Sequence, residues 1–302
     1  MLSPADVAQF KRDGYFIQRK VFQGQVLERL RASARQVQDY TRQHLPEGTR
    51  YWFGGQENKA IIPAEQRPWA TWGVNEITRK SLFDPELVNV FAHPVVHQAM
   101  HALLDQPRAW GIKILWTPKV VSYNLGWHRD QMGHDAYDYI MYKPEAQDHV
   151  QFNAALNDDP CFIVVPGSHR RKLTAEEWHA LRTDKTAVLP GQVEAAIGPG
   201  DILYMDAHTL HRGMSSTEGD RLTLHYSCQS QWVPLQPWGK AEDFEFITSD
   251  EFMNQLHPDA RPYYERLRTA ERTDDAMAFA FEAAKAHGYI RPAVKAARAN
   301  AG

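Results

Sequence analysis

The sequence Gly126-Trp127-His128-Arg129-Asp130 places an imidazole and a carboxylate on either side of a single residue. Side chains of an extended strand alternate between its two faces, so His128 and Asp130 project to the same side. Two such groups on one face can hold a metal ion from two directions. This stretch therefore predicts a metal site at a strand end, completed by a third ligand from elsewhere in the chain.

A second stretch, Gly200 to His211, supplies the third ligand. It begins as a Gly-Asp turn, continues as the apolar segment Ile202-Leu203-Tyr204-Met205 and closes on a histidine. Two histidines and one carboxylate form the facial triad of non-haem Fe(II) oxygenases, which leaves coordination positions open for other ligands. His208 is a rival, but it lies three residues before His211, and the two cannot share one face of a strand. We prefer His211 because Arg221 then follows ten residues later, which is the separation expected between the second histidine ligand and the arginine.

Arg221 begins the apolar segment Arg221-Leu222-Thr223-Leu224-His225-Tyr226. An arginine fork is the side chain best suited to hold a carboxylate with two parallel hydrogen bonds. Beside an Fe(II) site, the expected carboxylate is the distal one of 2-oxoglutarate, whose other end chelates the metal. Arg221 is therefore predicted to bind this cosubstrate.

His-x-Asp by itself is a weak motif in a chain with 14 histidines. The alternative is a hydrogen-bonded histidine at a strand end, with the aspartate capping a turn. His-Arg-Asp also opens the protein-kinase catalytic loop, but that loop needs Asn where Asp135 stands here, and the chain has no Gly-rich phosphate loop. The order of the four residues, all within the β-rich third of the chain, favours the metal site.

The composition is that of a globular protein, with 302 residues, 43% hydrophobic and 24% charged. A formal charge of -3 gives no reason to expect nucleic acid or an anionic membrane as a partner. No apolar run approaches the roughly 18 residues of a membrane span, and because the first residues lack the basic and apolar regions typical of a secretory signal, none is expected. Cys161 and Cys228 are expected to be free thiols in a cytoplasmic protein. The sequence is compatible with either a monomer or a homodimer.

The predicted fold class is mainly β with flanking helices in one domain. Residues 1–109 are expected to carry helices and an irregular, aromatic-rich insertion at 45–80, which we predict covers the site. Residues 110–235 carry the β core, and 236–302 a helical extension. Short strands separated by Gly, Pro and Asp turns favour a barrel or jelly roll over βαβ units. The expected strands are 110–116, 120–124, 150–156, 161–165, 192–196, 201–205 and 222–227. The expected helices start near Ser3 and cover 24–42, 87–104, 173–181, 249–256, 263–268 and 274–287.

The chain resembles the phytanoyl-CoA dioxygenase family of Fe(II)/2-oxoglutarate-dependent oxygenases. The matching segments are Leu2 to Phe16, Trp127-His128-x-Asp130, Val164-Val165-Pro166-Gly167-Ser168-His169, and Gly200-Asp201 through His211 to Arg221. The resemblance implies a double-stranded β-helix, the cupin-like jelly roll, with iron on His128, Asp130 and His211. It also implies that Arg221 anchors 2-oxoglutarate and that Asn153 contacts it. Gly213 departs from the family, because many relatives have serine there.

The implied activity consumes O2 and 2-oxoglutarate, releases succinate and CO2, and oxidises an unactivated C–H bond of a small molecule, most simply by hydroxylation. Two alternatives stay open: an iron oxygenase that uses no keto acid, and a non-catalytic relative that binds a small molecule in the same barrel. Trp127, Trp72 and His169 are the predicted substrate-pocket residues.

Overall fold

The computed structural model describes residues 2–51, 62–130, 147–233 and 241–270. The chain opens with helix α1 (Pro4–Asp13), which Ser3 and Asp6 close with a capping box. Gly14 ends the helix at φ 79°, and strand β1 (Tyr15–Gln18) follows. A side chain at Gly14 would also place its Cβ 2.4 Å from Thr209 Oγ1, so glycine is required here for two reasons.

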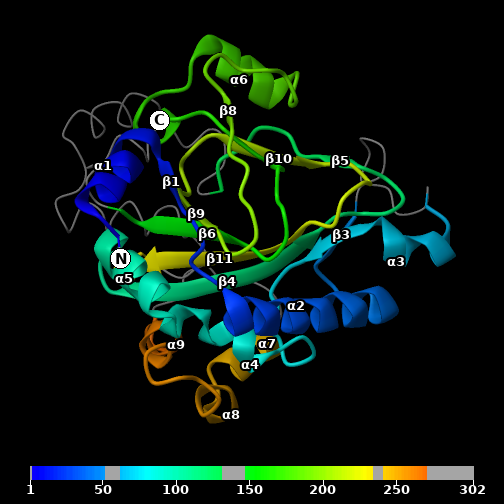
Figure 1. Ribbon diagram of the computed structural model, residues 1–302, viewed down its shortest axis with the longest axis vertical. Helices are drawn as coiled ribbons and strands as arrows, with labels where there is room; N and C mark the ends of the chain where they lie inside the picture. The colour runs from blue at the N-terminus through cyan, green and yellow to red at the C-terminus, as the bar shows by residue number, and fades with distance from the viewer. Residues whose placement is uncertain (1, 52–61, 131–146, 234–240, 271–302) are drawn as a thin grey trace, which may run out of the picture.

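Two antiparallel sheets form the core, and in Figure 1 they face each other across the middle of the molecule. The major sheet has the strand order β1-β9-β6-β11-β4-β3-β2, and the minor sheet β5-β10-β7-β8. The predicted mainly β jelly-roll fold with flanking helices is confirmed. The remaining strands are β2 (Thr49–Tyr51), β3 (Thr71–Val74), β4 (Pro107–Trp116), β5 (Tyr123–Asn124), β6 (His149–Ala155), β7 (Phe162–Val164), β8 (Val193–Glu194), β9 (Ile202–Asp206), β10 (His211–Ser215) and β11 (Leu222–Ser230).

Strand β10 is missing from the predicted strands. Its sequence, His211-Arg212-Gly213-Met214-Ser215, is polar and contains glycine, so it shows no apolar alternation. It is nevertheless paired on both sides, with β5 and with β7. Neighbouring strands, rather than its own propensity, give this segment its extended conformation.

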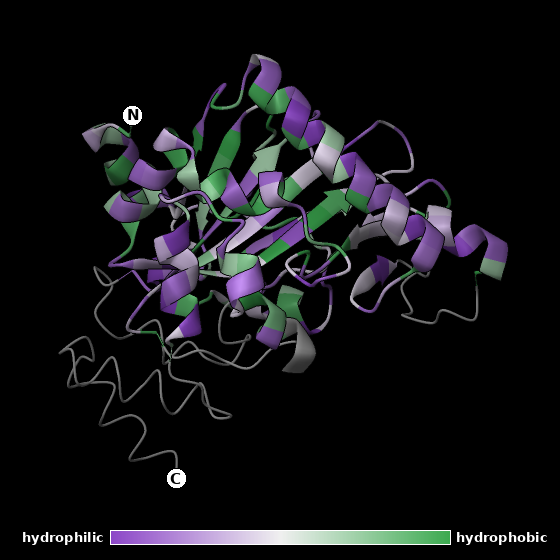
Figure 2. Ribbon diagram, turned by 90° about the horizontal axis from the view of Figure 1, so that it is seen from below, coloured by the Kyte–Doolittle hydropathy of each residue, from purple (hydrophilic) through white to green (hydrophobic). Residues whose placement is uncertain are grey.

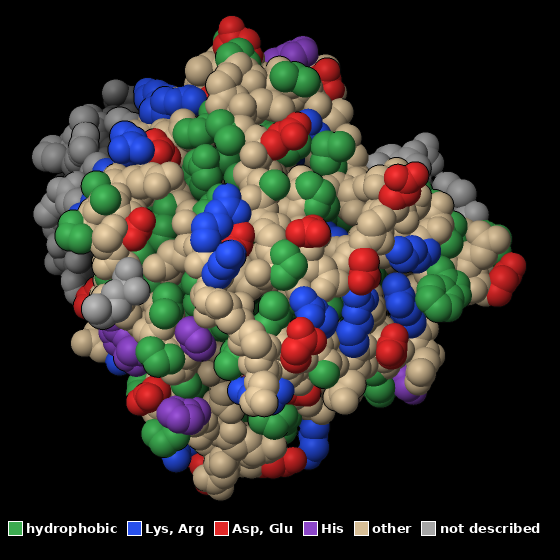
Figure 3. All heavy atoms as spheres, in the orientation of Figure 1, with side chains coloured by type: hydrophobic (Ala, Val, Ile, Leu, Met, Phe, Trp, Pro, Cys, Tyr) green, Lys and Arg blue, Asp and Glu red, His purple; other side chains and the backbone are tan. Residues whose placement is uncertain are grey.

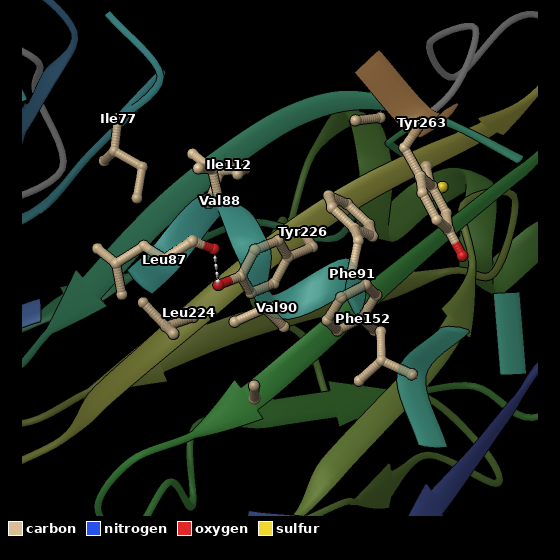
Figure 4. Close-up of a cluster of buried hydrophobic side chains, with 14 of the residues drawn as sticks. Ile77, Leu87, Val88, Val90, Phe91, Ile112, Phe152, Leu224, Tyr226 and Tyr263 are labelled. Atoms are coloured by element: carbon tan, nitrogen blue, oxygen red, sulfur yellow. Dashed lines mark hydrogen bonds between the residues drawn. The ribbon is translucent and has the colours of Figure 1, made fainter. Parts of the chain in front are cut away.

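Helices cover the outer face of the major sheet. They are α2 (Gly24–His44), α4 (Pro85–Val88), η2 (Asn89–Ala92), α5 (Pro94–Leu103) and α9 (Arg261–Arg268). Phe91 lies at the centre of the shared core, against Phe152, Tyr226 and Tyr263, and the Tyr226 hydroxyl donates to the Leu87 carbonyl at 2.8 Å (Figure 4). Figure 2 shows hydrophobic strands inside and hydrophilic stretches on the surrounding helices. One core therefore joins residues from the beginning, middle and end of the described chain.

The expectation of an irregular segment over 45–80 is wrong for much of its described part. Strands β2 and β3 extend the major sheet beyond β4, and η1 (Ala64–Gln66) and α3 (Arg67–Ala70) precede β3. Strands β2 and β3 have three and four residues, too few to show the hydrophobic alternation typical of a strand. Gly73 lets β3 approach β4, because a Cβ there would lie 2.7 Å from the Ile114 carbonyl oxygen. Residues 52–61 of this segment lie outside the described residues.

The C-terminal part contains α7 (Ala241–Ile247), which the sequence analysis missed, together with α8 (Asp250–Met253) and α9. Tyr263 and Tyr264 of α9 pack on Phe91, so this part lies on the outside of the major sheet. The predicted helix 274–287 lies outside the described residues.

Helix α6 (Ala175–Arg182) lies within one residue of the predicted helix 173–181 at its C-terminal end and begins with a capping box of Thr174 and Glu177. Both cysteines are free and buried. Acidic and basic side chains are interspersed on the face shown in Figure 3. Within the described ranges, no helix has the length and apolar character needed to cross a membrane.

Candidate active site

His128, Asp130 and His211 come together where the segment before residue 131 meets the start of β10. The His128 N–H donates to the His211 carbonyl and the His211 N–H to the His128 carbonyl, both at 3.0 Å. The Asp130 N–H donates to the Ala207 carbonyl at 3.0 Å, which fixes the aspartate beside the pair. One ligand atom from each of the three side chains lies within 4.8 Å of the others.

The ring orientations suit a metal. Nδ1 of His128 lies 2.7 Å from the Gly126 carbonyl oxygen, and Nδ1 of His211 lies 2.9 Å from the Thr209 carbonyl oxygen. A carbonyl accepts, so each Nδ1 carries the proton and each Nε2 keeps a free lone pair. The two Nε2 atoms lie 3.7 Å and 3.8 Å from Asp130 Oδ1. Two nitrogen donors and one oxygen donor therefore converge on one point.

The charge states of the group also suit a divalent cation. Burial, reinforced by the neighbouring His211, lowers the pKa of His128 to about 4, so its imidazole is neutral at neutral pH. Burial opposes ionisation of Asp130, but His211, Lys113 and His128 outweigh it and hold the pKa of the carboxyl well below its usual value. Asp130 Oδ2 is buried without a hydrogen-bond partner among the described residues. A bound cation would satisfy this oxygen.

His208, the rival histidine, lies apart from this group. Its Nε2 is 2.9 Å from Asp148 Oδ2, and both side chains are buried. A turn in which the Thr209 N–H donates to the Asp206 carbonyl separates His208 from the strand that begins at His211. The structure thus joins His211, and not His208, to His128 and Asp130.

One cavity of about 90 Å³ is lined by all three of these residues and by Arg221. Its other polar lining includes Arg50, Lys113, Tyr123, Gln151 and His225, which the sequence analysis did not single out. Lys113 interrupts an apolar segment of β4 between Ile112 and Ile114, and that signal could have identified it. Gln151 is one of several polar residues that alternate with the core residues of β6, so its strand marks it less clearly. Arg50 and Tyr123 lie in segments without such a pattern.

Arg221 is 5% exposed and is held from several sides. Its Nε lies 2.8 Å from Asp159 Oδ2, one η nitrogen donates to the Tyr123 hydroxyl, and the other lies 3.4 Å from His225 Nε2. Asp159 also accepts from Thr223 Oγ1 at 2.6 Å and from the Cys161 N–H at 2.9 Å. Asp159 therefore occupies the Nε side of the guanidinium. A ligand carboxylate can bind on the η side, which carries the two terminal nitrogens.

Asp159 is expected to be essential for stability, because it is the buried counter-charge of Arg221. Breaking a buried ion pair from one side typically costs about 3–5 kcal/mol. Asp159→Ala should therefore lower the free energy of unfolding, measured with urea, by an amount of this order. The exposed neighbour Asp158 is the matched control, and Asp158→Ala should change it by less than about 0.5 kcal/mol. Equal effects of the two substitutions would contradict the role given to Asp159.

Trp127, predicted to line the substrate pocket, points away from it. Its ring packs with Leu181 and Leu189 beside α6, and its Nε1 donates to the Ala187 carbonyl at 2.8 Å. The reason is the alternation that places His128 correctly, since adjacent residues of an extended segment face opposite sides. The pocket assignment for Trp127 is therefore corrected.

The other predicted contacts also lie outside the cavity lining. Trp72 stacks on Tyr123 with ring centroids 4.4 Å apart, so it supports a lining residue from behind. His169 is buried against Gly14, and its Nε2 accepts from Arg170 Nε at 3.0 Å. Asn153 accepts a hydrogen bond from Gln151 Nε2 at 3.3 Å and is 2% exposed.

Buried histidines should make the metal-free protein sensitive to acid. Burial lowers the pKa of His149 to about 4, although Asp148 and Asp130 oppose this shift. Between about pH 6.5 and pH 4 the unfolded chain therefore binds a proton at this residue that the folded protein does not. The free energy of unfolding should fall from pH 7 to pH 5, and this fall should be smaller in His149→Gln. An unchanged pH dependence in the variant would show that other groups cause it.

Comparisons with known proteins agree with this fold. The phytanoyl-CoA dioxygenase (PhyH) family model matches residues 10–223. Among curated proteins there is no match. HygX from Streptomyces hygroscopicus, solved with nickel and 2-oxoglutarate bound, is 17% identical, with 78% of this chain and 91% of that chain covered and a TM-score of 0.56.

The epimerase SnoN from nogalamycin biosynthesis, solved with Fe3+, alpha-ketoglutarate and nogalamycin RO, is 21% identical, with 78% and 87% covered and a TM-score of 0.53. EctD from S. alaskensis, solved with 2-oxoglutarate and 5-hydroxyectoine, is 17% identical, with 78% of each chain covered and a TM-score of 0.51. These structures share the fold. The family match covers more than half of the chain, which therefore belongs to the phytanoyl-CoA dioxygenase family of Fe(II)- and 2-oxoglutarate-dependent enzymes.

Proposed function

We propose that this enzyme hydroxylates an unactivated C–H bond of a small molecule, with His128, Asp130 and His211 as its iron ligands and Arg221 as the anchor of 2-oxoglutarate. The observation that carries the proposal is the convergence of two Nε2 atoms and one carboxylate oxygen on a cavity that Arg221 also lines. The carboxylate-binding arginine favours 2-oxoglutarate over an oxygenase without a keto acid. The open side of the triad favours catalysis over simple binding.

The bound iron supplies the reaction of O2 with 2-oxoglutarate, and the protein supplies positions and charges. His128 and His211 hold the metal as neutral imidazoles, and Asp130 offsets one of its charges. The η side of Arg221, with the Tyr123 hydroxyl beside it, receives the distal carboxylate. Asp159 keeps the guanidinium oriented, and its carboxylate balances the positive charge of Arg221. Leu115, Leu125 and Phe162 give the same cavity an apolar wall that limits water.

We further propose a single oxygenase domain over residues 1–302, with 110–235 as its core. The common hydrophobic core from Phe10 to Leu267 supports this. The segment 45–80 contributes Arg50 to the cavity and Trp72 behind it, which supports a role in substrate selection. A cytoplasmic location, the absence of nucleic-acid partners and the possibility of a homodimer stay predictions from the sequence.

Succinate formation tests the proposal directly. The purified protein should convert 2-oxoglutarate to succinate in air only when Fe(II) is added, and slowly until a true substrate is found. Zn(II) in place of Fe(II) should give none, because it has no redox chemistry. An oxygenase without a keto acid would consume O2 at a rate independent of 2-oxoglutarate. Failure of the anaerobic Fe(II) protein to bind 2-oxoglutarate at all would refute the proposal.

A further inference from the structure

A second cavity, of about 160 Å³, adjoins the cavity of the triad. Its lining includes Asn75, Glu76, Trp110 and Ser227. Arg50 and Lys113 line both cavities, so they form the boundary between them. These two cationic side chains therefore face both the triad and the second cavity.

Lys113 is not needed by the fold. It lies on β4 opposite His225 of β11, between Ile112 and Ile114, which pack into the core on the other face of the sheet. Strand alternation therefore turns its side chain inward, to a position where an aliphatic residue would continue the strand equally well. Within the described ranges the ammonium group of Lys113 has no hydrogen bond or ion pair. Burial lowers the pKa of its ammonium group, although Asp130 and Glu76 oppose this shift.

Arg50 is held in place without a carboxylate partner in the part of the chain that the structure describes. Its Nε donates to Asn75 Oδ1 at 2.8 Å, and its guanidinium carbon lies 5.0 Å from the centre of the Trp72 ring. Both contacts orient the group without neutralising it. Glu76 also lines the second cavity, but its carboxylate lies 3.4 Å from Arg79 Nη2, and this arginine matches its charge.

The charge balance of the loaded site leaves room for an anion. Asp130 offsets one of the two charges of Fe(II), and Asp159 cancels Arg221. The two charges of 2-oxoglutarate then match two of the three remaining positive charges, which belong to the metal, Lys113 and Arg50. One positive charge is left in a partly buried site. Such a charge favours an anionic group on the next ligand to enter.

We propose that Lys113 and Arg50 bind an anionic group of the substrate, a carboxylate or a phosphate, and that the enzyme therefore oxidises acidic small molecules. This rests on the proposed function, because it assumes that 2-oxoglutarate occupies the Arg221 side of the cavity. Arg50 and Lys113 are then specificity-determining residues. They hold the acidic end of the substrate at the boundary between the cavities while a carbon farther along the molecule faces the triad.

Small probes test this without knowledge of the substrate. The protein is saturated with Fe(II) and 2-oxoglutarate under anaerobic conditions and titrated calorimetrically with butyrate, butyl phosphate or the neutral butyramide. At least one anion should bind ten times more tightly than butyramide. The anion that binds more tightly shows whether the anionic group of the substrate is a carboxylate or a phosphate. Lys113→Met and Arg50→Gln should each weaken that binding at least tenfold and raise the dissociation constant for 2-oxoglutarate by a clearly smaller factor, because both residues also line the cavity of the triad.

Lys119→Met is the matched control, because Lys119 is exposed and its Nζ donates only to the Gly219 carbonyl at 2.8 Å among its described contacts. It should leave probe binding unchanged. Equal binding of butyrate, butyl phosphate and butyramide would overturn the inference. So would a loss of 2-oxoglutarate affinity in Lys113→Met as large as the loss of probe affinity, because the lysine would then serve the cosubstrate. The absorption band of the Fe(II)–2-oxoglutarate complex reports the proposed function separately, since it is recorded before any probe is added.

Discussion

His211→Ala is expected to abolish the anaerobic complex of Fe(II) and 2-oxoglutarate, seen as loss of its metal-to-ligand charge-transfer absorption. The substitution removes one of three converging donors, and the remaining pair holds the cation from two directions only. Loss of an outer-shell partner alone typically costs 10–100-fold in metal affinity. Loss of a ligand should exceed that, and Fe(II) affinity should fall by more than about 100-fold. His128→Ala and Asp130→Ala should behave in the same way.

His208→Ala is the matched control for this experiment. His208 is also a buried histidine of the same segment, but it is paired with Asp148 instead of the triad. The variant should lose stability, because Asp148 is left buried without its partner, and yet keep the absorption band at saturating Fe(II). Loss of the band in His208→Ala together with its retention in His211→Ala would show that the metal lies elsewhere.

Arg221→Lys should raise the dissociation constant for 2-oxoglutarate at least tenfold. Arg221 has to serve two anions at once: its Nε side faces Asp159, and its η side is left for the cosubstrate. A lysine has one ammonium group and cannot reproduce both contacts. Loss of a buried charged contact typically costs about 2–5 kcal/mol, which corresponds to tenfold or more in affinity. The measurement is a titration of the charge-transfer absorption with 2-oxoglutarate.

Two controls separate ligand binding from folding in the Arg221 experiment. Fe(II) affinity, measured without 2-oxoglutarate, should be nearly unchanged, because Arg221 is not among the converging ligands. Tyr123→Phe removes only the hydroxyl that accepts from Arg221, and it should weaken 2-oxoglutarate binding by a smaller factor. An unaltered dissociation constant in Arg221→Lys would contradict the assignment.

Local sequence patterns determined much of this protein. The period-two alternation over β4, β6, β9 and β11 predicted the β core, and the capping residues Ser3 and Thr174 marked two helix starts. Both signals depend on residues only two or three positions apart in the sequence. They can therefore be recognised without the tertiary structure. The order of His128, Asp130, His211 and Arg221 also sufficed to predict that they lie together.

Only the tertiary structure determined which strands and side chains these residues contact. Strand β10 is extended because two other strands pair with it, and Asp159, which the sequence analysis did not single out, is the buried partner of Arg221. Arg50 reaches the cavity of the triad from a segment nearly eighty residues before His128, and no local pattern marks it. Periodicity fixes which face of a strand a side chain occupies. Strand order and register across the whole chain determine what lies opposite that face.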